Sequence, residues 1–373
     1  MNKTTQKLTD RGVSIWLDTL SRELVEDGGL SALISDFGVS GATTNPTIFA
    51  KAICGSDRYD DQITALLQDG VHDPRDLFLA LAVEDVRRAA ELLRPLYEAS
   101  AGRQGFVSFE CTPDVAYDAA ATVDQALALW KRLGVPNVMI KVPATSPGIK
   151  AIEELTAHGV NVNVTLLFAV ERYEQAVEAY LRGLERRLRA GYPLTGIDSV
   201  ASFFVSRIDA RIDAKLPADS PLRGQIAIAN ARAAYERFHK RFSGPRWQLL
   251  VHHGACSQGL LWASTATKDP DYRDVLYLEQ LALPGTILTV PEPTLRAYAD
   301  HGDAERTAPV DGQAAERTLA AAGAVDLPAI TADLEREGVE AFAASYRELL
   351  GCIEQRVHAL RADTGIARMK VLS

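Results

Sequence analysis

Short apolar or alternating runs recur along the chain, and amphipathic stretches with helical spacing of apolar residues lie between them. This alternation of strand and helix predicts a parallel sheet covered by helices. Eight such units predict a closed (β/α)8 barrel, an α/β fold. The predicted strands are VSIWLD (13–18), GATTN (41–45), GFVSFE (105–110), VMIKVPA (138–144), VNVNVTLLF (160–168), VASFFVSR (200–207), LLWAST (260–265) and TILTV (286–290).

The segment RWQLLVHHG (246–254) is the ambiguous part of this pattern, because its apolar run also fits a strand. Ser243 and Pro245 resemble a helix start and Gly254 resembles a helix stop, so we interpret the segment as a helix. A doubly wound open sheet is the alternative fold. Such a sheet normally carries a glycine-rich turn after its first strand, and WLDTLSREL (16–24) contains no glycine.

The 373 residues are interpreted as one domain, with the barrel over about 13–300 and a helical C-terminal extension over about 301–373. The extension includes the helical pattern GVEAFAASYRELLGCIEQRVHAL (338–360), which we expect on the outside of the barrel.

Composition and charge limit the partners and the location expected for this chain. A formal net charge of −9 argues against a nucleic-acid partner, although a local basic pocket for a phosphorylated small molecule remains compatible with it. The start MNKTTQKLTDRG lacks the apolar core of a signal peptide, and no run has the length of a membrane span, so we expect a cytoplasmic protein. We expect free thiols at the four widely spaced cysteines, Cys54, Cys111, Cys256 and Cys352.

Polar residues interrupt strands that should be apolar on both faces in a parallel barrel. In VNVNVT, for example, Asn161, Asn163 and Thr165 share one face. Each polar residue alone could be a hydrogen-bonded core residue, but together they predict a site at the C-terminal mouth of the barrel. The others at or near strand ends are Asp18, Thr43, Asn45, Ser108, Glu110, Lys141 and Ser202.

Lys141 lies within the apolar run VMIKVPA (138–144). It could be a salt-bridged structural lysine, or a nucleophilic amine that forms an imine with a ketone. A lysine of pKa about 10.4 is neutral in about one molecule in a thousand at pH 7, and moving it to neutrality costs about 4 kcal/mol, which apolar burial can supply. Ionised Asp18 and Glu110 would oppose that shift, so we expect at least one of them to be neutral or separated from the amine by water.

These motifs, taken in order, resemble the transaldolase family, whose longer-chain bacterial members share most of residues 13–300 with this sequence. The matching stretches are WLDTLSREL, GATTNPTIF, VSFE, VMIKVPAT, GVNVNVTLLF, ASFFVSRID and LWAST. The resemblance implies a class I Schiff-base enzyme with a (β/α)8 barrel that needs no metal and no organic cofactor. It implies transfer of a dihydroxyacetone unit, from sedoheptulose 7-phosphate to glyceraldehyde 3-phosphate, in the pentose phosphate pathway. The products would be erythrose 4-phosphate and fructose 6-phosphate.

The resemblance also implies roles for individual residues. Lys141 would form the imine, Asp18 would take the proton of the donor's C4 hydroxyl, and Glu110 with Thr165 would position a water for proton transfer. Other residues would bind the sugar phosphate: Thr43, Asn45, Ser108, Asn163, Ser202, Phe204, Arg207, Ser264 and Lys268. Fructose-6-phosphate aldolase relatives have Gln and Tyr at the positions of Glu110 and Phe204, so this pair implies transfer instead of simple aldol cleavage.

Two positions depart from the longer-chain relatives. Gly259 stands where they usually have Arg, and Gln225 where they commonly have Lys. Both changes remove positive charge. Three interpretations follow: phosphate recognition depends on Arg207, Ser264 and Lys268, or the acceptor sugar is unusual, or the two positions serve only the surface.

Three alternatives remain open at this level. A related transaldolase or aldolase acting on a specialised sugar would use the same imine chemistry. A non-catalytic sugar-phosphate-binding protein would need a missing lysine or acid, and Lys141 and Asp18 are both present. A metal-dependent aldolase has only His252–His253 in its favour, and adjacent residues are a poor ligand pair. We expect a monomer or a homodimer, with no nucleic-acid or membrane partner.

Overall fold

The computed structural model describes residues 1–323 and 325–364, so the last residues of the expected extension, 365–373, lie outside it. Eight parallel strands pair in chain order, and β1 also pairs with β8, which closes the barrel. The (β/α)8 prediction is therefore confirmed, and the open-sheet alternative is wrong. The strands are β1 (Ser14–Leu17), β2 (Val39–Thr43), β3 (Phe106–Glu110), β4 (Val138–Pro143), β5 (Val162–Leu167), β6 (Ser199–Phe204), β7 (Gly259–Ala263) and β8 (Thr286–Val290).

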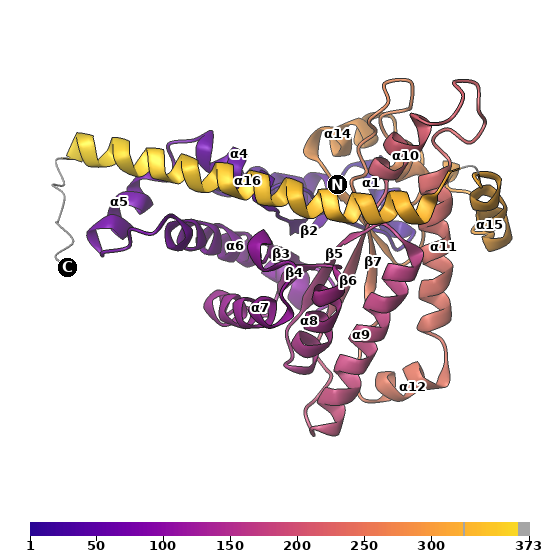
Figure 1. Ribbon diagram of the computed structural model, residues 1–373, viewed down its shortest axis with the longest axis horizontal. Coiled ribbons are helices and arrows are strands. Elements are labelled where there is room, and N and C mark those ends of the chain that lie inside the picture. Colours follow the sequence, from indigo (N-terminus) through magenta and orange to yellow (C-terminus); the bar gives the residue numbers. More distant parts are fainter. Residues whose placement is uncertain (324, 365–373) are drawn as a thin grey trace.

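Helices follow the strands and surround the barrel (Figure 1). The segment with two interpretations is a helix, α12, as predicted. The α-helices are α1 (Lys3–Asp10), α2 (Arg22–Glu26), α3 (Gly29–Phe37), α4 (Pro46–Cys54), α5 (Asp60–Gln68), α6 (Pro74–Ala99), α7 (Ala119–Leu133), α8 (Ser146–Ala157), α9 (Val170–Arg189), α10 (Ser206–Asp213), α11 (Ile226–Arg241), α12 (Pro245–His252), α13 (Leu276–Gln280), α14 (Glu292–His301), α15 (Gly312–Ala321) and α16 (Leu327–Thr364). Two short 3-10 helices are η1 (Pro113–Val115) and η2 (Ala304–Arg306).

Several helices begin at side chains that accept hydrogen bonds from the first backbone N–H groups. Asp73 caps α6, Asp118 caps α7 and Thr145 caps α8, each in an extended backbone conformation. Asn45 caps α4 by accepting from the N–H of Ile48. The strand predicted over 41–45 therefore ends two residues earlier, because the side chain of Asn45 starts the next helix.

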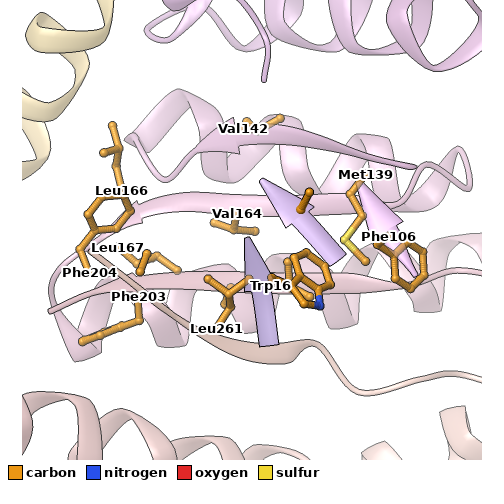
Figure 2. Packing of buried hydrophobic residues seen from close by; sticks show 14 of the residues in the cluster. Trp16, Phe106, Met139, Val142, Val164, Leu166, Leu167, Phe203, Phe204 and Leu261 are labelled. Atoms are coloured by element: carbon orange, nitrogen blue, oxygen red, sulfur yellow. The ribbon is translucent and has the colours of Figure 1, made fainter. Parts of the chain in front are cut away.

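The N-terminal half of the barrel interior is filled by large apolar side chains. Trp16 and Phe106 are both about fully buried, with ring centroids 6.3 Å apart, and Met139 lies near Phe106 (Figure 2). Gly41 belongs to the same layer: a Cβ atom there would lie 2.5 Å from the Trp16 ring, so only glycine leaves room for the indole. This end of the interior is packed solid, which restricts any cavity to the opposite end.

The C-terminal extension packs on helices outside the barrel strands and also reaches the barrel mouth. The long helix α16 runs across the molecule (Figure 1) and contacts α4, α5, α6 and α10. Its Phe342 lines the same cavity as Lys141 at the barrel mouth. The segment therefore packs against helices outside the strands, as expected, and in addition contributes Phe342 to the barrel mouth. The physical reason is that α16 buries apolar residues such as Leu349 and Ile353 against helices that follow the strand ends.

The cysteine expectation is half right. Cys111 and Cys256 are free thiols, whereas Cys54 of α4 and Cys352 of α16 form a disulfide with their Cα atoms 6.0 Å apart. Sequence spacing could not reveal this pair, because 298 positions separate the two residues and only helix packing brings them together. Within the described ranges, no helix is both long enough and apolar enough to cross a bilayer.

Candidate active site

Lys141 lies inside the barrel on β4, between its register neighbours Glu110 on β3 and Asn163 on β5. The residue is 4% exposed. The Nζ atom donates a hydrogen bond to the backbone carbonyl of Thr44 at 3.1 Å and lies 3.5 Å from Oε2 of Glu110. The amine is thus held by one carbonyl and one carboxyl group, and neither contact closes off its remaining bonding positions.

Glu110 is a buried carboxyl group with an incomplete set of partners. Its Oε2 atom, although near Lys141, forms no hydrogen bond within the described part of the chain. Burial raises the pKa of Glu110 to about 7; the Lys141 amine opposes this rise and Asp18 adds to it. Near neutral pH the group can therefore both hold and release a proton. The direction of this shift favours the expectation that at least one acid beside Lys141 is neutral or separated from the amine by water, which stays a prediction.

Asp18 follows the last residue of β1 and is half-buried. Its Oδ1 atom accepts a hydrogen bond from Thr43 Oγ1 at 3.0 Å, and Thr43 also shares a hydrogen bond with Thr289 at 3.1 Å. The threonine pair fixes the orientation of the carboxylate. Because only one of its oxygens has this partner, Asp18 keeps acceptor capacity toward the cavity that it lines.

Asn163 is held in one orientation by two serines. Its Oδ1 atom accepts from Ser202 Oγ at 2.7 Å, and its amide nitrogen donates to Ser108 Oγ at 2.9 Å. Ser108 is fully buried behind Asn163. The structure therefore places Ser202 at the cavity and Ser108 and Asn163 in the layer beneath it.

Thr165 supplies another buried oxygen without a partner. Its hydroxyl is fully buried, lines the cavity, and has no hydrogen bond among the described residues. Buried polar atoms are nearly always satisfied by protein, water or ligand. Unpaired oxygens on Thr165 and Glu110, on strands that flank β4, mark the surroundings of Lys141 as a binding site for a polar group.

A cavity of about 160 Å³ opens where these strands end. Of the predicted site residues, Glu110, Ser108 and Asn163 lie behind its wall and the others line it. The lining residues are Asp18, Thr43, Asn45, Lys141, Thr165, Ser202, Phe204, Arg207, Ala263, Ser264, Ala266, Lys268, Thr289, Pro291 and Phe342. Thr289 and Phe342 were not predicted: Thr289 reads as part of an ordinary strand, and Phe342 as one more apolar position on a helix.

Arg207 brings an unpaired cation to the rim of this cavity. Its guanidinium lies over the Phe204 ring, 5.4 Å from the centroid, and no hydrogen bond or ion pair to it occurs among the residues described. Burial lowers the pKa of Arg207, and nearby Asp18 opposes this effect. A guanidinium with all its donors free is suited to bind a phosphate group.

Ser264 and Lys268 complete the rim opposite the polar wall. Ser264 has a left-handed backbone conformation (φ 57°) just after β7, and its hydroxyl shares a hydrogen bond with Ser206 at 2.9 Å. A residue other than glycine rarely adopts this conformation, and such strain is found most often at functional sites. Lys268 is exposed and lines the same cavity.

The two positions that depart from the longer-chain relatives lie elsewhere. Gly259 begins β7, at the barrel end opposite Ser264, and Gln225 is exposed before α11; neither lines the cavity. The histidines His252 and His253 lie at the end of α12. In residues 1–323 and 325–364, no group of three or more His, Cys, Asp or Glu side chains is arranged to hold a metal ion.

Comparison with known proteins gives a consistent family. The family model described as Transaldolase/Fructose-6-phosphate aldolase matches residues 15–353. A protein named Transaldolase from Acidothermus cellulolyticus is 46% identical over 367 residues, covering 96% of this chain and 98% of its own length. A Transaldolase from Saccharopolyspora erythraea is 46% identical, covering 95% of this chain and 98% of its own. Transaldolase 1 from Streptomyces coelicolor is 45% identical and covers 96% of each chain.

Proposed function

The chain belongs to the Transaldolase/Fructose-6-phosphate aldolase family and is a transferase of the transaldolase group, and on this premise we propose that Lys141 forms a Schiff base with a ketose phosphate. The observation that carries the proposal is the buried Lys141 amine, 3.5 Å from a Glu110 carboxyl whose pKa is raised to about 7. An amine must be neutral to attack a carbonyl carbon, and a neighbouring group must manage the protons.

Imine formation can begin with the transfer of one proton between Lys141 and Glu110. When it passes from the ammonium to the carboxylate, the same pair becomes a neutral amine and a carboxylic acid. The amine attacks the ketone, and one of its protons moves to the ketone oxygen. The Glu110 proton converts the resulting hydroxyl to a leaving water, which produces a protonated imine and a carboxylate. The unpaired Thr165 hydroxyl supports a water position for these transfers.

Bond cleavage then needs a base at the donor's C4 hydroxyl, and Asp18 is oriented for this role by Thr43. Asp18 takes the hydroxyl proton, the C3–C4 bond breaks, and its electrons move into the protonated imine to form an enamine. The aldose phosphate leaves. With an acceptor aldose phosphate the same steps run in reverse, and Asp18 returns the proton to the new hydroxyl.

The remaining polar residues position the sugar. Ser202 and Asn45 line the cavity beside Lys141, and Asn163 is oriented behind Ser202 by two hydrogen bonds. We assign the hydroxyls of the three-carbon unit to this wall. The phosphate is assigned to the rim formed by Arg207, Ser264 and Lys268, where the free guanidinium offers a bidentate contact.

The placement of Gly259 and Gln225 outside the cavity supports common sugar phosphates as substrates. The proposed reaction converts sedoheptulose 7-phosphate and glyceraldehyde 3-phosphate to erythrose 4-phosphate and fructose 6-phosphate. Glu110 and Phe204, at the positions where fructose-6-phosphate aldolases have Gln and Tyr, support transfer over simple cleavage.

Borohydride trapping tests this proposal. The protein is incubated with fructose 6-phosphate, reduced, and its mass is measured intact and after digestion. We expect a reduced dihydroxyacetone adduct on the peptide that contains Lys141, and none with Lys141→Met. An unchanged mass, or an adduct on another lysine, contradicts the proposal. A coupled assay with erythrose 4-phosphate, compared with non-phosphorylated sugars, then tests the assignment of Arg207 and its neighbours to the phosphate.

A further inference from the structure

We propose that Phe342 determines how strongly this enzyme favours transfer of the three-carbon unit over its release, an inference that rests on the proposed imine chemistry. Of the described residues that line the cavity, Phe342 alone comes from α16; the others come from the strands and the segments that follow them. Its ring centroid lies 5.9 Å from Nζ of Lys141. The residue is therefore close enough to cover the reacting carbon atoms once an imine has formed.

The ring of Phe342 has two physical effects at this position. It is 6% exposed and replaces solvent on one side of the cavity. Its π face, near the nitrogen, also attracts a positive charge, and the protonated imine carries one. Exclusion of water protects the neutral enamine from protonation at carbon, whereas the attraction to positive charge stabilises the protonated imines that form before and after it.

Contacts on both sides of Phe342 hold it in place. One turn before it, Glu337 forms an ion pair with Arg211 of α10 at 2.5 Å. Gly338 lies against Leu166, where a Cβ atom would come within 2.8 Å of the end of the leucine side chain, so a larger residue would have to displace that side chain. One turn after Phe342, Ser345 shares a hydrogen bond with Thr47 of α4 at 2.8 Å.

These contacts connect α16 to segments that carry site residues. Helix α10 contains Arg207, and α4 is capped by Asn45, which lines the cavity. The disulfide between Cys54 and Cys352 adds a covalent link between α4 and α16. The position of the Phe342 ring is thus set by the same elements that set the sugar-binding wall and the phosphate rim.

The intermediate has two fates that Phe342 can influence. In transfer, the enamine carbon attacks an acceptor aldehyde. In release, a water-derived proton forms a C–H bond at the enamine carbon, and the imine is then hydrolysed to dihydroxyacetone and free Lys141. The water consumed in this hydrolysis balances the water lost when the imine formed, so release amounts to simple aldol cleavage. Only the release path needs a water-derived proton at the enamine carbon.

The test measures dihydroxyacetone released from fructose 6-phosphate against the three-carbon unit transferred to erythrose 4-phosphate. With Phe342→Ala we expect the ratio of release to transfer to rise about tenfold. Phe342→Leu keeps an apolar side chain and should stay near the ratio of the unchanged enzyme if water exclusion dominates; a rise as large as that of Ala assigns the effect to the aromatic face. It also keeps the proposal testable if the alanine variant does not fold.

Leu349→Ala is the matched control, because Leu349 is fully buried on α16 and does not line the cavity. The Leu349→Ala substitution removes packing contacts of α16 without opening the active site, so the ratio of release to transfer should not change. Borohydride trapping of each variant separates the two proposals: absence of an adduct in the unchanged enzyme removes the imine chemistry itself. If an adduct forms on Lys141 but Phe342→Ala leaves the ratio unchanged, or Leu349→Ala raises it equally, Phe342 has no role in specificity.

Discussion

Arg22 and Asp85 form a buried cation–carboxylate pair between α2 and α6, and Lys141 and Glu110 form another inside the barrel. In the first pair, the guanidinium approaches Asp85 Oδ1 at 2.9 Å through two of its nitrogens. Tyr59 donates to the other Asp85 oxygen at 2.9 Å. In the second pair the charged atoms are 3.5 Å apart, and Glu110 Oε2 has no hydrogen-bond partner among the described residues.

The pKa values of the two carboxyl groups are raised by the same cause, burial, but different neighbouring groups oppose that rise or add to it. Burial raises the pKa of both Asp85 and Glu110, and a neighbouring cation opposes the rise in each case. Around Asp85, hydrogen bonds from Tyr59 and Arg22 add to that opposition. Around Glu110 the nearby Asp18 acts the other way and favours the protonated acid.

The difference between the pairs is that a fully bonded ion pair supports the fold, whereas an incompletely bonded pair leaves protons free to move. A static, satisfied pair cannot act as acid and base without breaking its own contacts. The pair in the barrel can, because the chain leaves part of its bonding capacity unused. This contrast yields predictions about activity for the Lys141–Glu110 pair and about stability for the Arg22–Asp85 pair.

The largest expected effect is loss of activity in Lys141→Met. Without the amine no imine can form, so kcat should fall roughly 10⁴-fold or more, while the protein remains folded because Met fits an apolar strand position. Transferase assays and circular dichroism check the two parts. Residual activity above one per thousand of the unchanged enzyme would assign the chemistry to another group.

Arg22→Met should act on stability alone. Removing one partner of a buried pair leaves Asp85 without its cation, which is expected to cost about 3 to 5 kcal/mol in the free energy of unfolding. Urea denaturation measures this cost, and kcat per folded molecule should change little. If kcat falls while stability is kept, the contrast between the two pairs does not hold.

Glu110→Gln should lower kcat by about 100- to 10,000-fold and change its pH dependence. At pH values below the Glu110 pKa of about 7, the carboxyl group is protonated and the pair consists of an ammonium and a carboxylic acid. The carboxylic acid cannot accept the ammonium proton, so activity in the unchanged enzyme should rise as pH increases through about 7. Rate profiles of both proteins from acid to alkaline pH check this. An identical inflection in the Gln variant would belong to a different group.

The smallest effect concerns stability against pH. The folded pKa of Glu110 is raised from 4.5 to about 7, so its contribution to stability is present in full below pH 4.5 and is lost as pH rises to about 7. The expected loss is of the order of 1 to 3 kcal/mol. Urea midpoints at several pH values, compared with Glu110→Gln, measure it. A Gln variant with the same slope as the unchanged protein would contradict the assignment.

Much of the site could be predicted because strand geometry is local. The alternation of side chains along a strand places Lys141 on the same face as Met139, and barrel topology brings it beside Glu110 and Asn163. Closure then brings Asp18 and Ser202 to the same cavity. Neighbouring strands of a parallel barrel fix these positions without any knowledge of side-chain packing.

Other features depend on contacts that no local pattern encodes. Ser108 and Asn163 share the predicted face, yet the packing of hydroxyl and amide groups places them one layer below the cavity wall. Asn45 was expected to end a strand, but the competition between strand pairing and helix capping was settled in favour of the cap.

The barrel, the strand that carries Lys141 and the polar mouth around it could all be read from the amino-acid sequence, because two short-range periodicities and chain order are enough to specify them. Three-dimensional packing was needed to place Phe342 near Lys141, to bring Cys54 to Cys352, and to leave Glu110 Oε2 without a hydrogen-bond partner among the described residues. The first two outcomes depend on how α16 packs against helices that are distant in the sequence. The third depends on which polar groups the tertiary packing leaves without hydrogen bonds.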